Sequence, residues 1–250
     1  MALIARAAYD GGTAGSVVPV IPPHDAQAGA PATYAAGMGG TTGARRAGAE
    51  GFGWYSTPLG ERSQVVHSWY WTPDGGTTTA GNAVISSVRS AAGAELAQVT
   101  RRSTGRLALR EGSVLRAETS SALAAGTYRL VHTISGATQQ LTVRRAADDS
   151  VVETITAPMP EGGFSTSVDG FVNNPGGTLT AVWDEHLWDD AGDPGPFGAQ
   201  GGGGGGGQEP TPGLEAWAVV VGGVERPATS VAVLVGGVER PLTAHEVVGH

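Results

Sequence analysis

The chain has 250 residues, with 15 basic and 23 acidic side chains and a formal net charge of −8 at pH 7. This balance excludes a nucleic-acid-binding protein, because a basic surface is needed to neutralise several phosphates. Cysteine is absent, which excludes disulfide scaffolds, thiol nucleophiles and Cys-ligated zinc. The 41 glycines and 15 prolines, with only 15% charged residues, indicate many turns and no long helices.

We expect no secretory signal at the N-terminus, because Arg6 and Asp10 interrupt its short apolar stretch. No segment reaches the roughly 18 apolar residues that a transmembrane helix needs. We therefore expect a soluble protein with no membrane insertion, which leaves its cell, if at all, by a route other than its own signal.

Residues 1–198 consist of short alternating runs divided by turn residues, a pattern typical of antiparallel β structure. In the clearest run, Gln64 to Trp71, the residues Val65, His67, Trp69 and Trp71 share one face. A Pro-Asp-Gly-Gly sequence then ends the run with turn residues.

Nine further runs follow along the chain. They are Ala83 to Arg89, Leu96 to Arg101, Arg106 to Arg110, Val114 to Glu118, Thr127 to Ser135, Gln139 to Arg145, Val151 to Thr156, Phe164 to Val172 and Thr178 to Trp188. Tight hairpins are predicted at Glu111-Gly112 and at Ser135-Gly136-Ala137. About ten strands with no helical periodicity predict an all-β fold, an antiparallel two-sheet jelly-roll sandwich.

Residues 199–213 form a Gly/Pro-rich linker that includes seven consecutive glycines, Gly201 to Gly207. The tail, residues 214–250, contains a repeat of 14 residues: Ala218 to Pro227 recurs as Ala232 to Pro241. Each unit has a Gly-Gly turn between two β runs and predicts a β-hairpin. Two hairpins bury no core by themselves, so we expect docking or a homo-oligomer, with a trimer as the candidate stoichiometry.

Two groups of residues suggest metal binding. One is an acidic cluster that offers the hard oxygen ligands that calcium prefers, although a strand ending in a solvated acidic loop is the favoured explanation: Asp184, Glu185, Asp189, Asp190 and Asp193. The other is the pair His245 and His250, whose spacing of five misses the i, i+4 spacing that zinc requires on a helix. We therefore predict no metal site and no cofactor, with calcium as the alternative.

No catalytic constellation is apparent. Asp184 and Glu185 are adjacent on a predicted strand and point to opposite faces, whereas glycoside hydrolysis needs two carboxylates that face one another. A Gly-x-Ser-x-Gly nucleophile motif is also missing. We predict that the protein is not an enzyme and has no catalytic residues.

Aromatic residues cluster on the predicted strands. Trp69, Trp71 and Trp183, with Asp184 beside them, could stack on and orient a sugar, and they are the candidate carbohydrate-binding residues. Large rings in a sandwich also commonly form its core, and this second interpretation stays open.

Three parts of the chain resemble the concanavalin A-like, laminin G-like jelly rolls. They are Arg62 to Pro73, Gly126 to Leu130 with Leu141 to Arg144, and Val182 to Glu185 before Gly195-Pro196. The resemblance implies a two-sheet jelly roll with a glycan-facing surface. The order of jelly roll, glycine-rich tether and hairpin repeats, without lysine or cysteine, resembles minor tail proteins of actinobacteriophages.

The second resemblance implies a structural component of a phage tail tip or fibre, located in the virion. Its implied partners are other tail proteins, copies of itself and a host cell-surface glycan. The alternatives are a cell-envelope polysaccharide hydrolase and a non-viral carbohydrate-binding module of the same fold.

Overall fold

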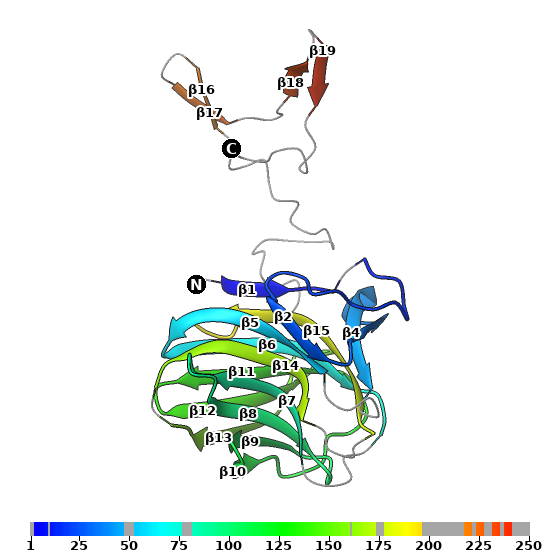
Figure 1. The fold of residues 1–250 in the computed structure, drawn as a ribbon, viewed down its shortest axis with the longest axis vertical. Coiled ribbons are helices and arrows are strands. Elements are labelled where there is room, and N and C mark those ends of the chain that lie inside the picture. The colour runs from blue at the N-terminus through cyan, green and yellow to red at the C-terminus, as the bar shows by residue number, and fades with distance from the viewer. Residues whose placement is uncertain are drawn as a thin grey trace. The chain divides into compact units, whose positions relative to one another are not determined.

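A computed structural model describes residues 3–9, 11–47, 53–76, 82–160, 162–173 and 178–196, and four short segments at 218–221, 224–227, 232–235 and 238–241. The chain divides into two compact units, residues 1–200 and 201–250, called here the body and the tail (Figure 1). Within the described residues, none of the helical structure is long and apolar enough to cross a membrane.

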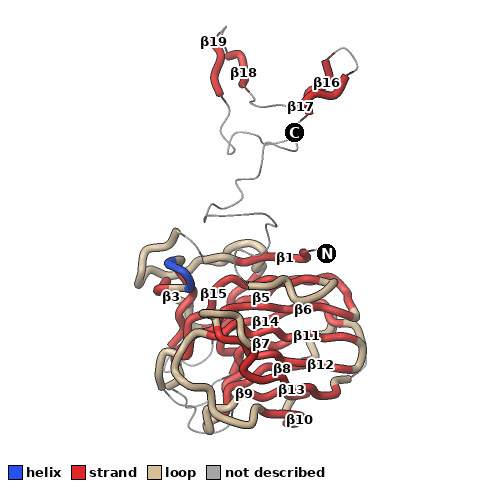
Figure 2. Tube along the Cα trace, turned by 180° about the vertical axis from the view of Figure 1, so that it is seen from behind, coloured by secondary structure: helices blue, strands red, loops and turns tan. Residues whose placement is uncertain are grey.

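The body is an all-β jelly-roll sandwich of two antiparallel sheets, as the sequence predicts (Figure 2). Sheet A has the order β13 (Val151–Pro158), β12 (Thr138–Arg145), β11 (Tyr128–Ser135), β6 (Gln64–Pro73), β15 (Thr180–Asp189), β4 (Thr42–Ala47) and β3 (Thr33–Ala36), with β1 (Leu3–Ala7) also paired to β15. Sheet B has the order β10 (Val114–Glu118), β9 (Leu107–Glu111), β8 (Glu95–Arg102), β7 (Asn82–Arg89), β14 (Phe164–Asn173), β5 (Gly53–Arg62) and β2 (Ala26–Gly29). A 3₁₀ turn, η1 (Met38–Gly40), connects β3 to β4.

The predicted strands from Gln64 onward agree with the structure to within about two residues at their ends. Both predicted hairpins are also present: β9 joins β10 through Gly112, with φ 51°, and β11 joins β12 through Gly136, with φ 58°. The left-handed backbone at these two positions favours glycine, which explains why the turns form there.

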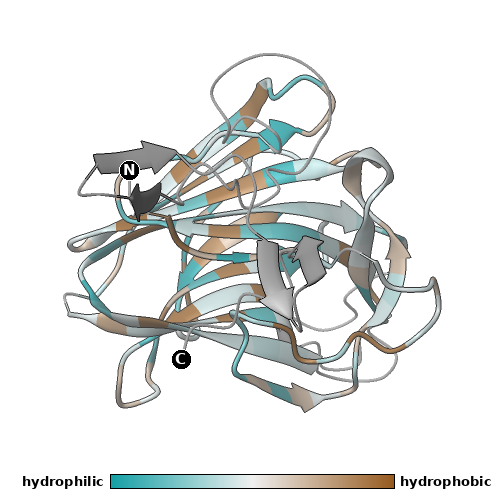
Figure 3. Cartoon of the chain, turned by 90° about the horizontal axis from the view of Figure 1, so that it is seen from above, coloured by the Kyte–Doolittle hydropathy of each residue, from teal (hydrophilic) through white to brown (hydrophobic). Residues whose placement is uncertain are grey.

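Apolar side chains between the sheets form two main clusters, and the strands alternate in hydropathy along their length (Figure 3). On β6, Trp69 and Trp71 belong to the first cluster and Val65 to the second. His67 lies between them in sequence and is fully buried, so a polar position separates the two apolar clusters on this strand.

Strand β15 contains a β-bulge between Asp184 and Leu187, where Glu185 has a φ of 47°. The extra residue shifts the alternation of the strand. As a result Trp183 and Trp188, five residues apart, both pack in the core.

The tail contains two antiparallel hairpins, β16 (Ala218–Val221) with β17 (Val224–Pro227), and β18 (Ala232–Val235) with β19 (Val238–Pro241). Their pairing confirms the hairpins predicted from the 14-residue repeat. The glycine run 201–207 and the terminal pair His245 and His250 lie outside the described residues.

Candidate functional site

The structure places the candidate carbohydrate-binding residues inside the body. Trp69 and Trp71 are fully buried and Trp183 is 2% exposed, all within the first apolar cluster. A buried ring offers no face to a glycan, so these three tryptophans are core residues, as the alternative interpretation holds.

Asp184 is also buried and is occupied by donors of the protein itself. Its Oδ2 accepts hydrogen bonds from the Met38 amide at 2.8 Å and the Thr41 hydroxyl at 2.7 Å, and its Oδ1 accepts from the Glu185 amide. Burial raises the pKa of Asp184 to about 6, and these hydrogen bonds oppose the rise. Its carboxylate therefore ties the β3–β4 connection to β15 rather than facing a ligand.

The other members of the acidic cluster bind different internal partners. Glu185 pairs with Arg6, the Asp189 carboxylate accepts from the Ala191 amide, Asp190 lies 3.7 Å from Arg62, and Asp193 pairs with Arg129. Calcium needs six to eight oxygens converging on one point, and these carboxylates bond separately to the protein.

Trp54 differs from the other tryptophans of the described residues, because its ring is only partly buried. On β5 the inward residues are Tyr55, Thr57 and Leu59, which places Trp54 on the outer face of sheet B. The guanidinium carbon of Arg89 lies 5.6 Å from the centre of the Trp54 ring, a cation–π contact.

Polar side chains continue this surface across β7 and β8. Arg89 Nη2 donates to Glu95 Oε1 at 2.9 Å, and the Gln98 side-chain amide donates to Glu95 Oε2. We call the surface formed by Trp54, Arg89 and Glu95 the Trp54 face; Gln98 is buried beneath Glu95 and supports it. It combines one accessible aromatic ring with hydrogen-bonding groups of both polarities, which is the chemistry that a sugar requires.

A second site lies in the interior, where His132, His67 and His186 occupy the neighbouring strands β11, β6 and β15. All three are fully buried. The His67 ring stacks between Trp69 and Trp188, with ring centres 4.3 and 4.6 Å away. This packing holds the imidazole plane and directs its edge into the space between the sheets.

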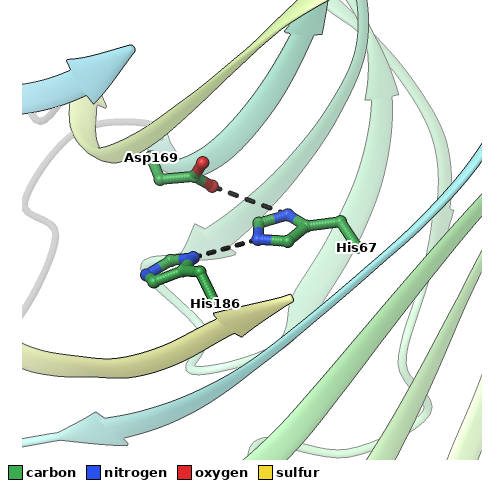
Figure 4. A group of neighbouring side chains, drawn as sticks. All are labelled: His67, Asp169 and His186. Atoms are coloured by element: carbon green, nitrogen blue, oxygen red, sulfur yellow. Dashed lines mark hydrogen bonds and ion pairs between the residues drawn. The ribbon is translucent and has the colours of Figure 1, made fainter. Parts of the chain in front are cut away.

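His67 has two ionisable neighbours. Its Nε2 lies 2.9 Å from His186 Nδ1, and its Nδ1 lies 3.7 Å from Asp169 Oδ1 on β14 of the opposite sheet (Figure 4). The Ser167 hydroxyl donates to Asp169 Oδ2 at 2.9 Å. Within the described residues, His67, Asp169 and His186 are the group of His, Cys, Asp or Glu side chains that could hold a metal ion.

Burial governs the protonation of these residues. It lowers the pKa of His67 well below its usual value, with a further contribution from His186, and it lowers the pKa of His186 in the same direction. Burial raises the pKa of Asp169 to about 7, and the nearby hydroxyls of Ser86 and Ser167 oppose the rise. Both imidazoles are therefore neutral at pH 7, the form in which they bind metals.

Trp54 and the interior histidines are not among the candidate site residues predicted from the sequence. For His67 and His132 a signal existed, since both fall on otherwise apolar strand faces. For Asp169 no local signal identifies a partner on another sheet.

No protein-family model matches the chain, and no curated protein is significantly similar in sequence. Among solved structures, the "Binding domain of Botulinum Neurotoxin DC in complex with SialylT" is 8% identical, with a TM-score of 0.44, covering 65% of this chain and 41% of its own. Lectin II from Ulex europaeus is 9% identical, with a TM-score of 0.40, and the match covers 63% of this chain and 86% of the lectin chain. Trypanosoma rangeli sialidase is 14% identical, with a TM-score of 0.45, and the match covers 75% of this chain and 30% of the sialidase chain. This chain thus matches less than half of the neurotoxin and sialidase chains, and likenesses at this level carry no activity over to it.

Proposed function

We propose that the body is a carbohydrate-binding module, without enzymatic activity, and that it binds a glycan at the Trp54 face. The observation that carries this proposal is the partly exposed ring of Trp54 beside Arg89, which is paired with Glu95. An apolar sugar face stacks on the ring, and the neighbouring polar groups bond to its hydroxyls.

The test is a glycan array and a host cell-wall pull-down with the full chain, followed by titration of the best glycan. Trp54→Ala should weaken binding at least tenfold, about 1.4 kcal/mol, since it removes the stacking surface. The matched control is Leu115→Ala, an exposed residue on the same outer face but five strands away, about 24 Å across the sheet, which should bind like the unchanged protein.

Two results would contradict the proposal. One is the absence of retention on any glycan or cell-wall fraction. The other is equal affinity of Trp54→Ala and Leu115→Ala, which would place the ligand elsewhere on the body.

We propose further that the chain is a structural component of a phage tail tip or fibre, with other tail proteins as partners. The support is the order of parts, a β-sandwich body followed by a glycine-rich run and two hairpins of one repeat. A sandwich suits surface binding, while hairpins that bury no core of their own suit docking. Mass spectrometry of purified virions should detect the chain, and its absence there would contradict a virion role.

A further inference from the structure

We propose that His67, Asp169 and His186 form a binding site for a divalent transition-metal ion, of which zinc is the type. The site goes beyond the proposed glycan binding and does not depend on it. His67 and His186 belong to sheet A and Asp169 to sheet B, so a bound ion would join the two sheets from inside.

The three side chains are grouped closely enough to reach one ion after rearrangement. One ligand atom from each of the three residues lies within 4.8 Å of the other two. Ligands about 2.1 Å from a tetrahedral zinc ion lie roughly 3.4 Å from one another. The 2.9 Å contact with His186 Nδ1 is made by His67 Nε2, whereas the 3.7 Å contact with Asp169 Oδ1 is made by His67 Nδ1. One ion takes one nitrogen of His67, so the side chains must turn for all three ligands to reach the ion.

Unsatisfied polar atoms point to the same conclusion. Asp169 Oδ1 and His186 Nε2 are buried and have no hydrogen-bond partner. If His67 Nε2 donates to His186 Nδ1, then His186 Nε2 is a buried N–H without an acceptor. If His186 Nδ1 donates instead, His186 Nε2 is a buried lone pair without a donor. Either tautomer leaves a buried polar atom unsatisfied, a cost that a metal ligand would not have.

The donor set selects the class of ion. Two imidazoles and one carboxylate suit zinc and related transition metals, whereas calcium and magnesium prefer oxygen ligands alone. A small pocket of about 10 Å³ is lined by Asp169 and His186, though not by His67. This is room for about one water molecule, which would complete a fourth coordination position.

The burial of the ligands determines what the ion would do. All three are at most 2% exposed, so no substrate reaches them and the ion would enter as the sandwich closes. Metal binding would then contribute to the free energy of folding in a chain without disulfide bonds.

His132 provides a matched control, since it is an equally buried histidine of the same row. Its Nε2 lies 3.3 Å from Gln139 Oε1, and it is not part of the group that could hold a metal. His245 and His250 provide a second control, because two histidines in the tail could bind zinc independently of the body.

The experiment refolds the untagged full chain with zinc chloride, removes free metal and measures bound zinc by mass spectrometry. We expect about one zinc per chain for the unchanged protein, for His132→Gln and for the double variant His245→Gln, His250→Gln. Asp169→Asn should lose it. A metal-free unchanged protein, equal zinc in Asp169→Asn, or loss of zinc in the double tail variant would overturn the proposal.

A second measurement on the unchanged protein covers the case in which Asp169→Asn does not fold. A chelator present during refolding should lower the melting temperature by several degrees, and added zinc should restore it. Cobalt should bind in place of zinc and give the visible bands of a four-coordinate ion. Equal melting temperatures with chelator and with zinc, together with no cobalt bands, would also overturn the proposal.

Discussion

Arg129 lies on the outward side of β11, yet its side chain is 1% exposed because two loop carboxylates cover it. It donates to both oxygens of Asp149, at 2.7 and 2.9 Å, and to both of Asp193, at 2.6 and 3.1 Å. Burial lowers the pKa of Arg129, but the hydrogen bonds to the two carboxylates outweigh it and the net shift is upward. The charge stays buried only because both acids compensate it.

Asp193→Asn tests this ion cluster at the residue scale. Burial raises the pKa of Asp193, but the hydrogen bonds from Arg129 and the Gly195 amide, together with the charges of Arg129 and Arg144, outweigh burial and the net pKa lies below the usual 3.8. A carboxyl whose pKa is lower in the folded state than in the unfolded state stabilises the protein at pH values above its unfolded pKa. This stabilisation is lost as the pH falls through its folded pKa. We expect a loss of about 1–3 kcal/mol at pH 7 that shrinks below about pH 4, measured by urea unfolding.

Asp74→Asn is the control for that prediction, because its ion pair with Arg45 is exposed to solvent. It should cost less than about 1 kcal/mol at pH 7. A difference between Asp193→Asn and the unchanged protein that is the same at pH 3 and pH 7 would contradict the assigned role of the carboxylate charge.

At the scale of the strand, the bulge in β15 decides which side chains meet in the interior. In a regular strand, residues an odd number apart point to opposite faces, so Trp183 and Trp188 would be separated. The bulge at Glu185 brings both rings into the core and directs His186 toward His67. The interior histidine contact therefore depends on one extra residue in one strand.

The strands from Gln64 onward were predictable because apolar and polar residues alternate there and turn residues mark the ends. The five earlier strands, β1 to β5, were not predicted. Strands β2, β3 and β4 consist largely of alanine, glycine and arginine, and their formation depends on neighbours distant in sequence.

The candidate sites were less predictable than the fold for a similar reason. His67 stands on an apolar face of the sequence, so its burial could be foreseen, but its contact with Asp169 spans two sheets. The difference between partly exposed Trp54 and buried Trp69 depends on which face of each strand is covered, and a single sequence does not contain that information.

At the scale of the molecule, the body and the tail obtain their stability differently. The body has its own core between two sheets, whereas each tail hairpin has four residues per strand and one partner strand. A lone two-stranded hairpin is marginal in water at best. Hairpins repeated with the same sequence gain stability when they pair with other copies, and a closed ring of copies satisfies every hairpin equally.

Light scattering tests this association. The full chain should have a mass of about 75 kDa, three times the 25.1 kDa of one chain, while a chain ending before Gln208 should be a monomer because only the body remains. A full-length double variant, Val220→Asp with Leu234→Asp, places a charge at equivalent positions of the two repeats and should also be monomeric, since like charges in apposed strands repel.

A monomeric full chain would remove the tail as an oligomerisation element, and a trimeric truncated chain would move that function to the body. If the full chain is trimeric and the charged variant monomeric, three bodies are held together through the tail, and weak binding of a single Trp54 face to a glycan would be strengthened by multivalency.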